Sequence, residues 1–275
     1  MSECSHNCST CSSKTCGEKQ DLHAKQNEFS NIKKVIAVGS GKGGVGKSSV
    51  TCLLAVMMAR RGYKVGVLDA DITGPSIPRA FGITQKAQGS EIGIIPAETH
   101  MGIKVMSINL LLEDETKPVV WRGPVLAGAV TQFWTDVVWG DLDVLFIDMP
   151  PGTGDVPLTV YQSLPVDATV VVSTPQSLVQ MVVGKAKTMA DMLNIPVVGL
   201  VENMSYLVCP DCNKRISLFG DENGLDEAAR RMEIALLAKL PINPAVSTLC
   251  DSGEIERVVC DEIAPAVDAV EALLK

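Results

Sequence analysis

The chain has 275 residues, of which 46% are hydrophobic and 20% charged, so it can bury a large core and is not globally disordered. Asp and Glu number 32 against 24 Lys and Arg, and this net charge of -8 argues against general nucleic-acid binding, which needs basic side chains to neutralise phosphates. The sequence contains no apolar run of about 18 residues, which a membrane span requires, and no signal-peptide core. We therefore expect a cytoplasmic protein without a membrane partner.

Residues 1–31 are rich in Ser, Cys, Lys, Asn and Gln and show no helical or strand period, which predicts a flexible tail before one domain over residues 32–275. Within that domain, short apolar β-branched runs predict strands at 34–39, 65–69, 103–108, 143–148, 168–173, 196–201 and 234–240. Segments with apolar residues every three to four positions predict helices at 48–61, 125–138, 178–193, 225–232 and 264–274. This alternation is typical of a doubly wound, mostly parallel α/β sheet with helices on both faces.

The glycine-rich turn after the first predicted strand fits two overlapping motifs. It contains G-x-G-x-x-G, and Asp69 ends the next strand, as in a dinucleotide-binding fingerprint. It also contains the P-loop G-x-x-x-x-G-K-[ST], which gives the Lys47-Ser48 pair a role: Lys47 reaches the β- and γ-phosphates and Ser48 holds Mg²⁺. We therefore favour the P-loop and predict that ATP binds to Gly41, Lys42, Gly43, Gly44, Val45, Gly46, Lys47, Ser48 and Ser49.

A P-loop also requires an acidic residue at a second strand end to assist in holding Mg²⁺. Asp148 ends the predicted strand 143–148, at the edge where parallel sheets bind their ligands. The Pro-Pro-Gly-Thr-Gly run that follows allows the backbone to approach closely and favours a loop that senses the γ-phosphate. Ser48 and Asp148 are the predicted magnesium ligands.

Several segments together resemble a known family. The P-loop with its additional Lys42 resembles the deviant P-loop of the MinD, ParA and nitrogenase-iron-protein class. Residues 139–155 look like the signature of the Mrp/ApbC group, which includes the eukaryotic cytosolic iron–sulfur scaffold ATPases, and Asp69-Ala-Asp71 and Cys209-Pro-Asp-Cys212 match that group too. The resemblance covers about residues 32–275. It implies a homodimeric ATPase of slow turnover that binds an iron–sulfur cluster and transfers it to recipient apo-proteins.

The resemblance also implies roles for individual residues. Lys42 is expected to reach across the dimer to the partner's nucleotide, and Lys47 to bind the β- and γ-phosphates. Asp71 is expected to orient the attacking water, Gly152 to lie near the γ-phosphate and Asn203 to contact adenine. The implied chemistry is phosphoryl transfer by positioning and charge neutralisation, without a covalent intermediate.

Cys209 and Cys212 form a C-x-x-C pair, which supplies two metal ligands. A zinc ion or a four-iron cluster needs four, and a two-fold dimer supplies the other two from the partner. Chemistry alone leaves zinc, iron and a redox dithiol open, whereas the resemblance implies a bridging 4Fe–4S cluster. We expect this pair and the phosphate site to lie at different edges of the sheet.

The remaining cysteines divide into a tail group and isolated residues. The tail group has the spacing C-x3-C-x2-C-x4-C, which fits a second cluster, a zinc ion or no stable metal, and consists of Cys4, Cys8, Cys11 and Cys16. It resembles the N-terminal cysteines of the eukaryotic scaffold branch, although its spacing is tighter. Cys52, Cys250 and Cys260 lack partners at metal-binding spacing and are predicted to be structural.

Two other functions compete with the iron–sulfur carrier. One is a MinD- or ParA-like positioning ATPase, which would need a basic DNA-binding face or a basic amphipathic C-terminal helix. Residues 260–275 are acidic and contain no lysine cluster, which argues against that function. The other is a P-loop ATPase whose cysteines bridge a dimer through zinc.

Overall fold

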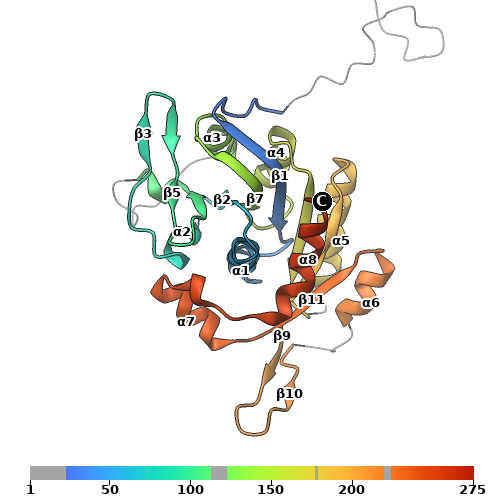
Figure 1. The fold of residues 1–275 in the computed structure, drawn as a ribbon. Coiled ribbons are helices and arrows are strands. Elements are labelled where there is room, and N and C mark those ends of the chain that lie inside the picture. The colour runs from blue at the N-terminus through green and yellow to red at the C-terminus, as the bar shows by residue number, and fades with distance from the viewer. Residues whose placement is uncertain (1–22, 73, 113–122, 177–178, 220–223) are drawn as a thin grey trace, which may run out of the picture.

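The computed structural model describes residues 23–72, 74–112, 123–176, 179–219 and 224–275 (Figure 1). Its main sheet has the strand order β11-β9-β8-β1-β7-β2-β6-β5, and β10 pairs with the outer end of β9. Neighbours from β11 to β6 run parallel, while β5 and β10 pair antiparallel, so the prediction of a mostly parallel sheet is confirmed. The strands are β1 Ser30–Gly39, β2 Val65–Asp69, β5 Ala97–Glu98, β6 Lys104–Met106, β7 Gly140–Asp148, β8 Ala168–Ser173, β9 Val197–Val208, β10 Arg215–Ile216 and β11 Leu236–Pro241.

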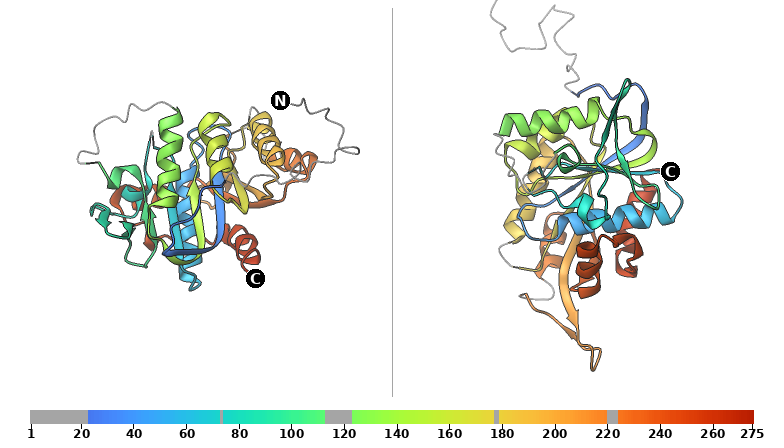
Figure 2. Two further views of the ribbon diagram at one scale, coloured as in Figure 1. Left: turned by 90° about the horizontal axis from the view of Figure 1, so that it is seen from above. Right: turned by 90° about the vertical axis from the view of Figure 1, so that its left-hand side faces the viewer.

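Helices cover both faces of this sheet (Figure 2). Alternate residues of β1 enter opposite cores: Ile36 packs in the core that includes α1 and α8, and Val35 in the core that includes α3 and α4. Residues of α5 and α6 form a third cluster against β8 and β9. The helices are α1 Lys47–Arg60, α2 Ile77–Ala80, α3 Gly123–Thr135, α4 Asp155–Ser163, α5 Val179–Met192, α6 Gly224–Arg231, α7 Pro244–Ser252 and α8 Ala264–Ala272, with 3₁₀ turns at Ile108–Leu110, Ile255–Arg257 and Asp261–Ile263.

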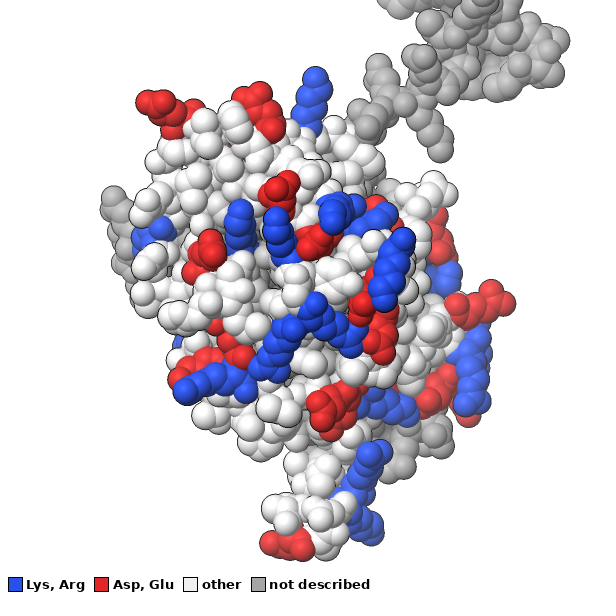
Figure 3. Space-filling view, viewed as in Figure 1, with Lys and Arg blue, Asp and Glu red and all other residues white. Residues whose placement is uncertain are grey.

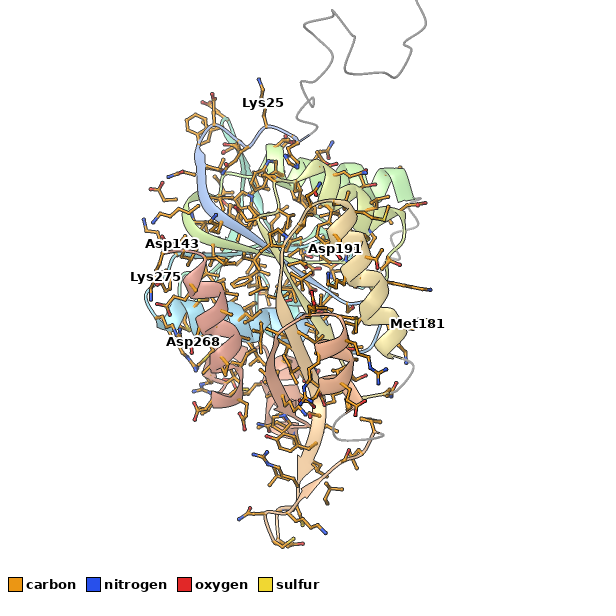
Figure 4. The ribbon with its side chains drawn as sticks, turned by 90° about the vertical axis from the view of Figure 1, so that its right-hand side faces the viewer. Lys25, Asp143, Met181, Asp191, Asp268 and Lys275 are labelled. Carbon is orange, nitrogen blue, oxygen red and sulfur yellow. The ribbon has the colours of Figure 1, made fainter. Side chains whose placement is uncertain are left out.

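Some elements lie where the sequence pattern predicts none. Helices α2, α4 and α7, a separate hairpin of β3 Gln88–Ser90 and β4 Gly93–Ile95, and strands β5 and β10 were not predicted. Strand β9 also continues to Val208, seven residues beyond its predicted end at 201. Helix α5 lies at the outside of the fold, with Met181 and Asp191 marking its length (Figure 4). No helix in the described part of the chain has the length and apolar character to cross a membrane.

The folded part of the chain begins before residue 32, where the sequence pattern places the domain boundary. The backbone N–H of Ala24 donates to the carbonyl of Ser163 at 2.8 Å, and the indole of Trp134 donates to the carbonyl of Ala24 at 3.0 Å. Strand β1 itself begins at Ser30, which is in register with Gly140 of β7. Residues 23–31 are therefore part of the domain, and the rest of the predicted tail lies outside the described residues.

Candidate functional site

The predicted P-loop lies at the carboxyl edge of the sheet, between the end of β1 and the start of α1. Gly44 and Gly46 have φ values of 79° and 78°, in the left-handed region that favours glycine. A Cβ at Gly46 would lie 2.2 Å from Nδ2 of Asn203, so no larger residue fits there without displacing that side chain. The turn leads directly into the N-terminus of α1, where unpaired backbone N–H groups and the helix dipole favour an anion such as phosphate.

A buried polar cluster connects the start of α1 to the end of β7. Nζ of Lys47 lies 2.6 Å from Oδ1 of Asp148, and Oγ of Ser48 donates to Oδ2 of Asp148 at 2.6 Å. Thr51, which the sequence analysis did not single out, donates to Oδ1 of Asp148 at 2.9 Å. Asp148 has no solvent exposure and Lys47 is 6% exposed. The structure thus brings together the residues predicted to bind the phosphates and Mg²⁺.

A second carboxylate, Asp69, lies beside this cluster at the end of β2, in register with Asp148. It is 1% exposed and accepts hydrogen bonds from the backbone N–H of Asp71 at 3.2 Å and from the hydroxyl of Ser107 at 3.2 Å. Burial, together with the nearby Asp148 carboxylate, raises the pKa of Asp69 well above its usual value. Asp69 therefore holds the backbone at the half-buried Asp71 in place. This positioning role of Asp69 was not predicted from the Asp69-Ala-Asp71 motif.

The loops after β1 and β7 contact one another at the same edge. The backbone N–H of Gly152 donates to the carbonyl of Ser40 at 2.8 Å, and the hydroxyl of Ser40 donates to the carbonyl of Lys42 at 3.0 Å. The Lys42 side chain is exposed and its Nζ donates to Oε1 of Gln176 at 3.2 Å. Gly152 thus lies against the P-loop, while Lys42 lies at the surface, away from the buried cluster.

A cavity of about 150 Å³ opens beside the P-loop. Asn203 lies on its wall, and Nδ2 of this residue donates to the carbonyl of Val45 at 2.9 Å. The apolar and amide groups around the cavity suit a flat heteroaromatic base. Much of the wall comes from the segment after β11, which the sequence analysis did not connect to the site. The lining residues are Gly46, Ser49, Leu53, Asn203, Met204, Leu240, Pro241, Ile242, Asn243, Val246, Ser247 and Cys260.

The cysteine pair lies at the tip of a hairpin formed by β9 and β10, which projects from the body (Figures 1 and 2). The backbone N–H of Cys209 donates to the carbonyl of Lys214 at 3.0 Å, which closes the loop. Cys212 is exposed and Cys209 is partly exposed. The backbone N–H groups of Cys212 and Asp211 hydrogen-bond to the Cys209 thiol and lower its pKa below the usual value, which favours the thiolate form that binds metals.

A family model described as ParA, NUBPL iron-transfer P-loop NTPase, matches residues 31–275. The chain belongs to this family. Among curated relatives, an iron-sulfur cluster carrier protein of Clostridium perfringens is 48% identical over 85% of this chain and 84% of its own length. Another, from Methanocaldococcus jannaschii, is 48% identical over 92% of this chain and 90% of its own. An Arabidopsis thaliana iron-sulfur protein required for NADH dehydrogenase is 43% identical over 81% of this chain and 71% of its own.

Solved structures agree with the fold of this P-loop NTPase. A nucleotide-binding protein of Archaeoglobus fulgidus, solved in complex with ADP, has 48% sequence identity and a TM-score of 0.74, covering 82% of this chain and 88% of that one. The cell division ATPase MinD of Pyrococcus furiosus is 19% identical, with a TM-score of 0.63 over 88% of this chain and 99% of its own. The MinD likeness bears on the fold alone.

The cysteine hairpin of this NTPase lies at the same edge of the sheet as the P-loop, so the prediction of different edges is wrong. Strand β9 runs parallel to β8, and β8 parallel to β1, so all these strands end at one carboxyl edge. The sequence pattern ends the strand at 201, too early to show that the same strand continues into the hairpin.

The other cysteines of the NTPase fall into two groups. Cys52 and Cys260 are buried, and Cys250 is partly buried beside Ser49, whose hydroxyl it contacts by a hydrogen bond. Within the described residues, no group of three or more His, Cys, Asp or Glu side chains is arranged to hold a metal ion. The predicted tail ligands Cys4, Cys8, Cys11 and Cys16 lie outside the described residues.

Proposed function

We propose that this NTPase hydrolyses ATP and, as a homodimer, carries an iron–sulfur cluster that it transfers to apo-proteins. The observation that carries the proposal is the position of the Cys209 and Cys212 pair, at the tip of a hairpin whose strand also lines the nucleotide cavity. The names of the Clostridium and Methanocaldococcus relatives as cluster carriers support the cargo. The ADP bound to the Archaeoglobus relative supports the nucleotide.

The residues at the P-loop fit ATP with Mg²⁺. The Ser48 hydroxyl and the Asp148 carboxylate are hard oxygen ligands of the kind that Mg²⁺ prefers, usually together with substrate phosphates and water. When bound, Mg²⁺ neutralises charge on the phosphates. Lys47 exchanges its bond with Asp148 for the β- and γ-phosphates, and the Gly152 loop lies near the γ-phosphate. Asp71 orients the attacking water, and Lys42 of one protomer reaches the nucleotide of its partner.

The cluster is the cargo of this cycle, and the cysteine loop is its binding site. Each chain offers the thiolates of Cys209 and Cys212, whereas a four-iron cluster takes four cysteine ligands. A two-fold axis through the loop brings the same pair from the partner, because an isologous interface places identical patches together. We propose that Cys4, Cys8, Cys11 and Cys16 hold a second cluster on each chain.

A transfer assay tests the proposal. Anaerobically reconstituted protein is mixed with an apo-ferredoxin, and the recipient's visible absorbance is followed. We expect the double variant Cys209→Ala, Cys212→Ala to lose transfer of the bridging cluster while still binding ATP, since neither cysteine lines the cavity. Ser252→Ala, at an exposed residue outside both the loop and the cavity, is the control and should transfer normally. Normal transfer by the double variant, or zinc in place of iron in the wild type, contradicts the proposal.

A further inference from the structure

Strand β9 is irregular at one point between the nucleotide cavity and the cysteines. Between the pairs Lys239–Glu202 and Pro241–Tyr206, β11 advances by two residues while β9 advances by four. Residues 203–205 therefore form a bulge in β9. At its centre, Met204 has a φ of 55°, a left-handed conformation that is uncommon for a long side chain. Bulges of this kind redirect a strand and are frequent beside active sites.

The inner side of the β9 bulge contacts the P-loop. Asn203 donates to the carbonyl of Val45 at 2.9 Å, and a Cβ built on Gly46 would lie 3.6 Å from Cε of Met204. Both bulge residues line the cavity beside the P-loop. A ligand that fills the cavity therefore contacts the bulge, and the P-loop backbone lies against it, with Val45 at Asn203 and Gly46 near Met204.

The outer side of the bulge is anchored in the sheet. The hydroxyl of Ser205 donates to Oε1 of Glu202 at 2.7 Å, which closes the bulge across its base. Glu202 is 1% exposed and pairs in register with Ser173, the last residue of β8, so the strand is held on this side up to that point. Nζ of Lys239 on β11 lies 3.8 Å from Oε2 of Glu202. The part of β9 before the bulge is thus fixed.

The part of β9 after the bulge forms one arm of the hairpin. Pairing with the β11 segment resumes at Tyr206, whose carbonyl accepts from the N–H of Ile242 at 2.7 Å. The arm then leaves the sheet and reaches Cys209 three residues later (Figure 4). A rotation at Met204 therefore changes the direction of the arm and the position of the cysteine loop.

We propose that Met204 and the β9 bulge are the positioning element that transmits nucleotide occupancy to the cysteine loop. This inference rests on the proposed function, because it names the segment through which bound ATP would alter the position of the cluster ligands. In this proposal Met204 changes between the left-handed conformation seen here and a relaxed one, and contact with the nucleotide selects between the two. The inference needs no cluster to be tested, because the cysteine thiols themselves report the position of the loop.

The test measures the rate of thiol alkylation at Cys209 and Cys212 in metal-free full-length protein. Peptide mass spectrometry separates these residues from the other cysteines, and light scattering sets a protein concentration at which the chain is monomeric. Rates are compared without nucleotide and with a non-hydrolysable ATP analogue. The Kd of the analogue is measured for each variant, and its concentration is set high enough to saturate that variant. In the wild type we expect the analogue to change the rate by about 5-fold or more, the lower end of ordinary coupling between sites.

Two variants and a matched control decide the outcome. Met204→Gly accepts the left-handed conformation and its alternatives without strain, and Ser205→Ala removes the bond across the base of the bulge, so the nucleotide effect should fall towards 1-fold in both. Glu233→Gly relaxes an exposed residue with the same φ of 55° outside the bulge and should respond as the wild type does. A wild type without a nucleotide effect, or undiminished effects in both variants, overturns the inference, whereas the transfer assay judges the carrier function separately.

Discussion

At the level of single residues, Lys47 has the clearest predicted effect. Its amine is buried against Asp148, where it is available to neutralise the β- and γ-phosphates. We predict that Lys47→Ala lowers ATP turnover by about 100–1000-fold, the usual cost of removing one such charge contact. Phosphate release measures the effect. Lys33→Ala, at a surface lysine paired with Asp143, is the control and should keep wild-type turnover. Full activity in Lys47→Ala contradicts the P-loop assignment.

Asp71 is predicted to act on hydrolysis and not on binding. Its backbone is held by Asp69, while its own carboxylate lies in the loop expected to orient the attacking water. Asp71→Ala should reduce turnover by about 100-fold or more, within the range for loss of a general base, and calorimetry should still detect ATP binding. Asp141→Ala, at an exposed residue at the start of β7, serves as control. Loss of binding in Asp71→Ala assigns the residue a different role.

Sequence signals predicted candidate site residues where the motif is local. Lys47, Ser48 and Asp148 follow from short motifs at strand ends, and the structure brings them within hydrogen-bond distance. Thr51 and the residues after β11 were not predicted, because only the folded chain brings them to the P-loop. The turn Asn243-Pro244 contained a usable signal: the Asn243 side chain accepts from the N–H of Ala245 at 2.9 Å and caps α7.

Among the elements, those with a strong hydrophobic period were predicted. Short helices that are marked only by the turn or capping residues at their start were missed. Helix α1 was placed within one residue at each end of its observed range, whereas α4 was missed although Asp155 follows a glycine-rich turn. Pro157 near the start of α4 reads as a helix breaker but is tolerated in a first turn. Strand β9 was predicted too short because residues 203–205 interrupt its pairing with β11, and because Leu207 and Val208 at its end pair only with the short β10.

The contact between α8 and the end of α1 supplies a pH-dependent prediction. Glu271 of α8 accepts hydrogen bonds from Lys275, Arg61 and Tyr63, which lower its pKa to about 2 (Figure 4 labels Lys275, which follows this helix). A carboxylate with a lowered pKa stabilises the fold above its unfolded-state pKa near 4.3, and this contribution disappears as the pH falls towards 2.

Glu271→Gln should therefore unfold at a lower temperature than the wild type at pH 7. The difference should shrink as the pH is lowered from about 4.3 to about 2, where the wild-type carboxyl becomes protonated. Thermal unfolding followed by circular dichroism measures both. Glu233→Gln, at an exposed position outside α1 and α8, is the control. A difference that persists unchanged at pH 2 shows that the Glu271 charge is not its source.

For the whole molecule, the exposed Lys42 implies a specific assembly. On the face seen in Figure 3, basic and acidic side chains are interspersed over the body. Lys42 lies at the P-loop edge and contacts Gln176 within its own chain. We predict that a non-hydrolysable ATP analogue shifts the protein to a dimer by light scattering, and that Lys42→Ala weakens this shift. Lys86→Ala, at another exposed lysine, should assemble normally. Equal assembly and activity in Lys42→Ala removes this residue from the mechanism.

The proposed function depends on two chains sharing one cluster at Cys209 and Cys212. Native mass spectrometry of anaerobically reconstituted protein lacking residues 1–22 tests it most directly, because that truncation removes the other predicted ligands and keeps Ala24, which contacts the domain. We expect a dimer that carries one cluster of about four iron atoms, and no such species in the Cys209→Ala, Cys212→Ala variant. A cluster bound to a single chain, a zinc-bridged dimer, or an unchanged cluster-bearing dimer in the variant would contradict it.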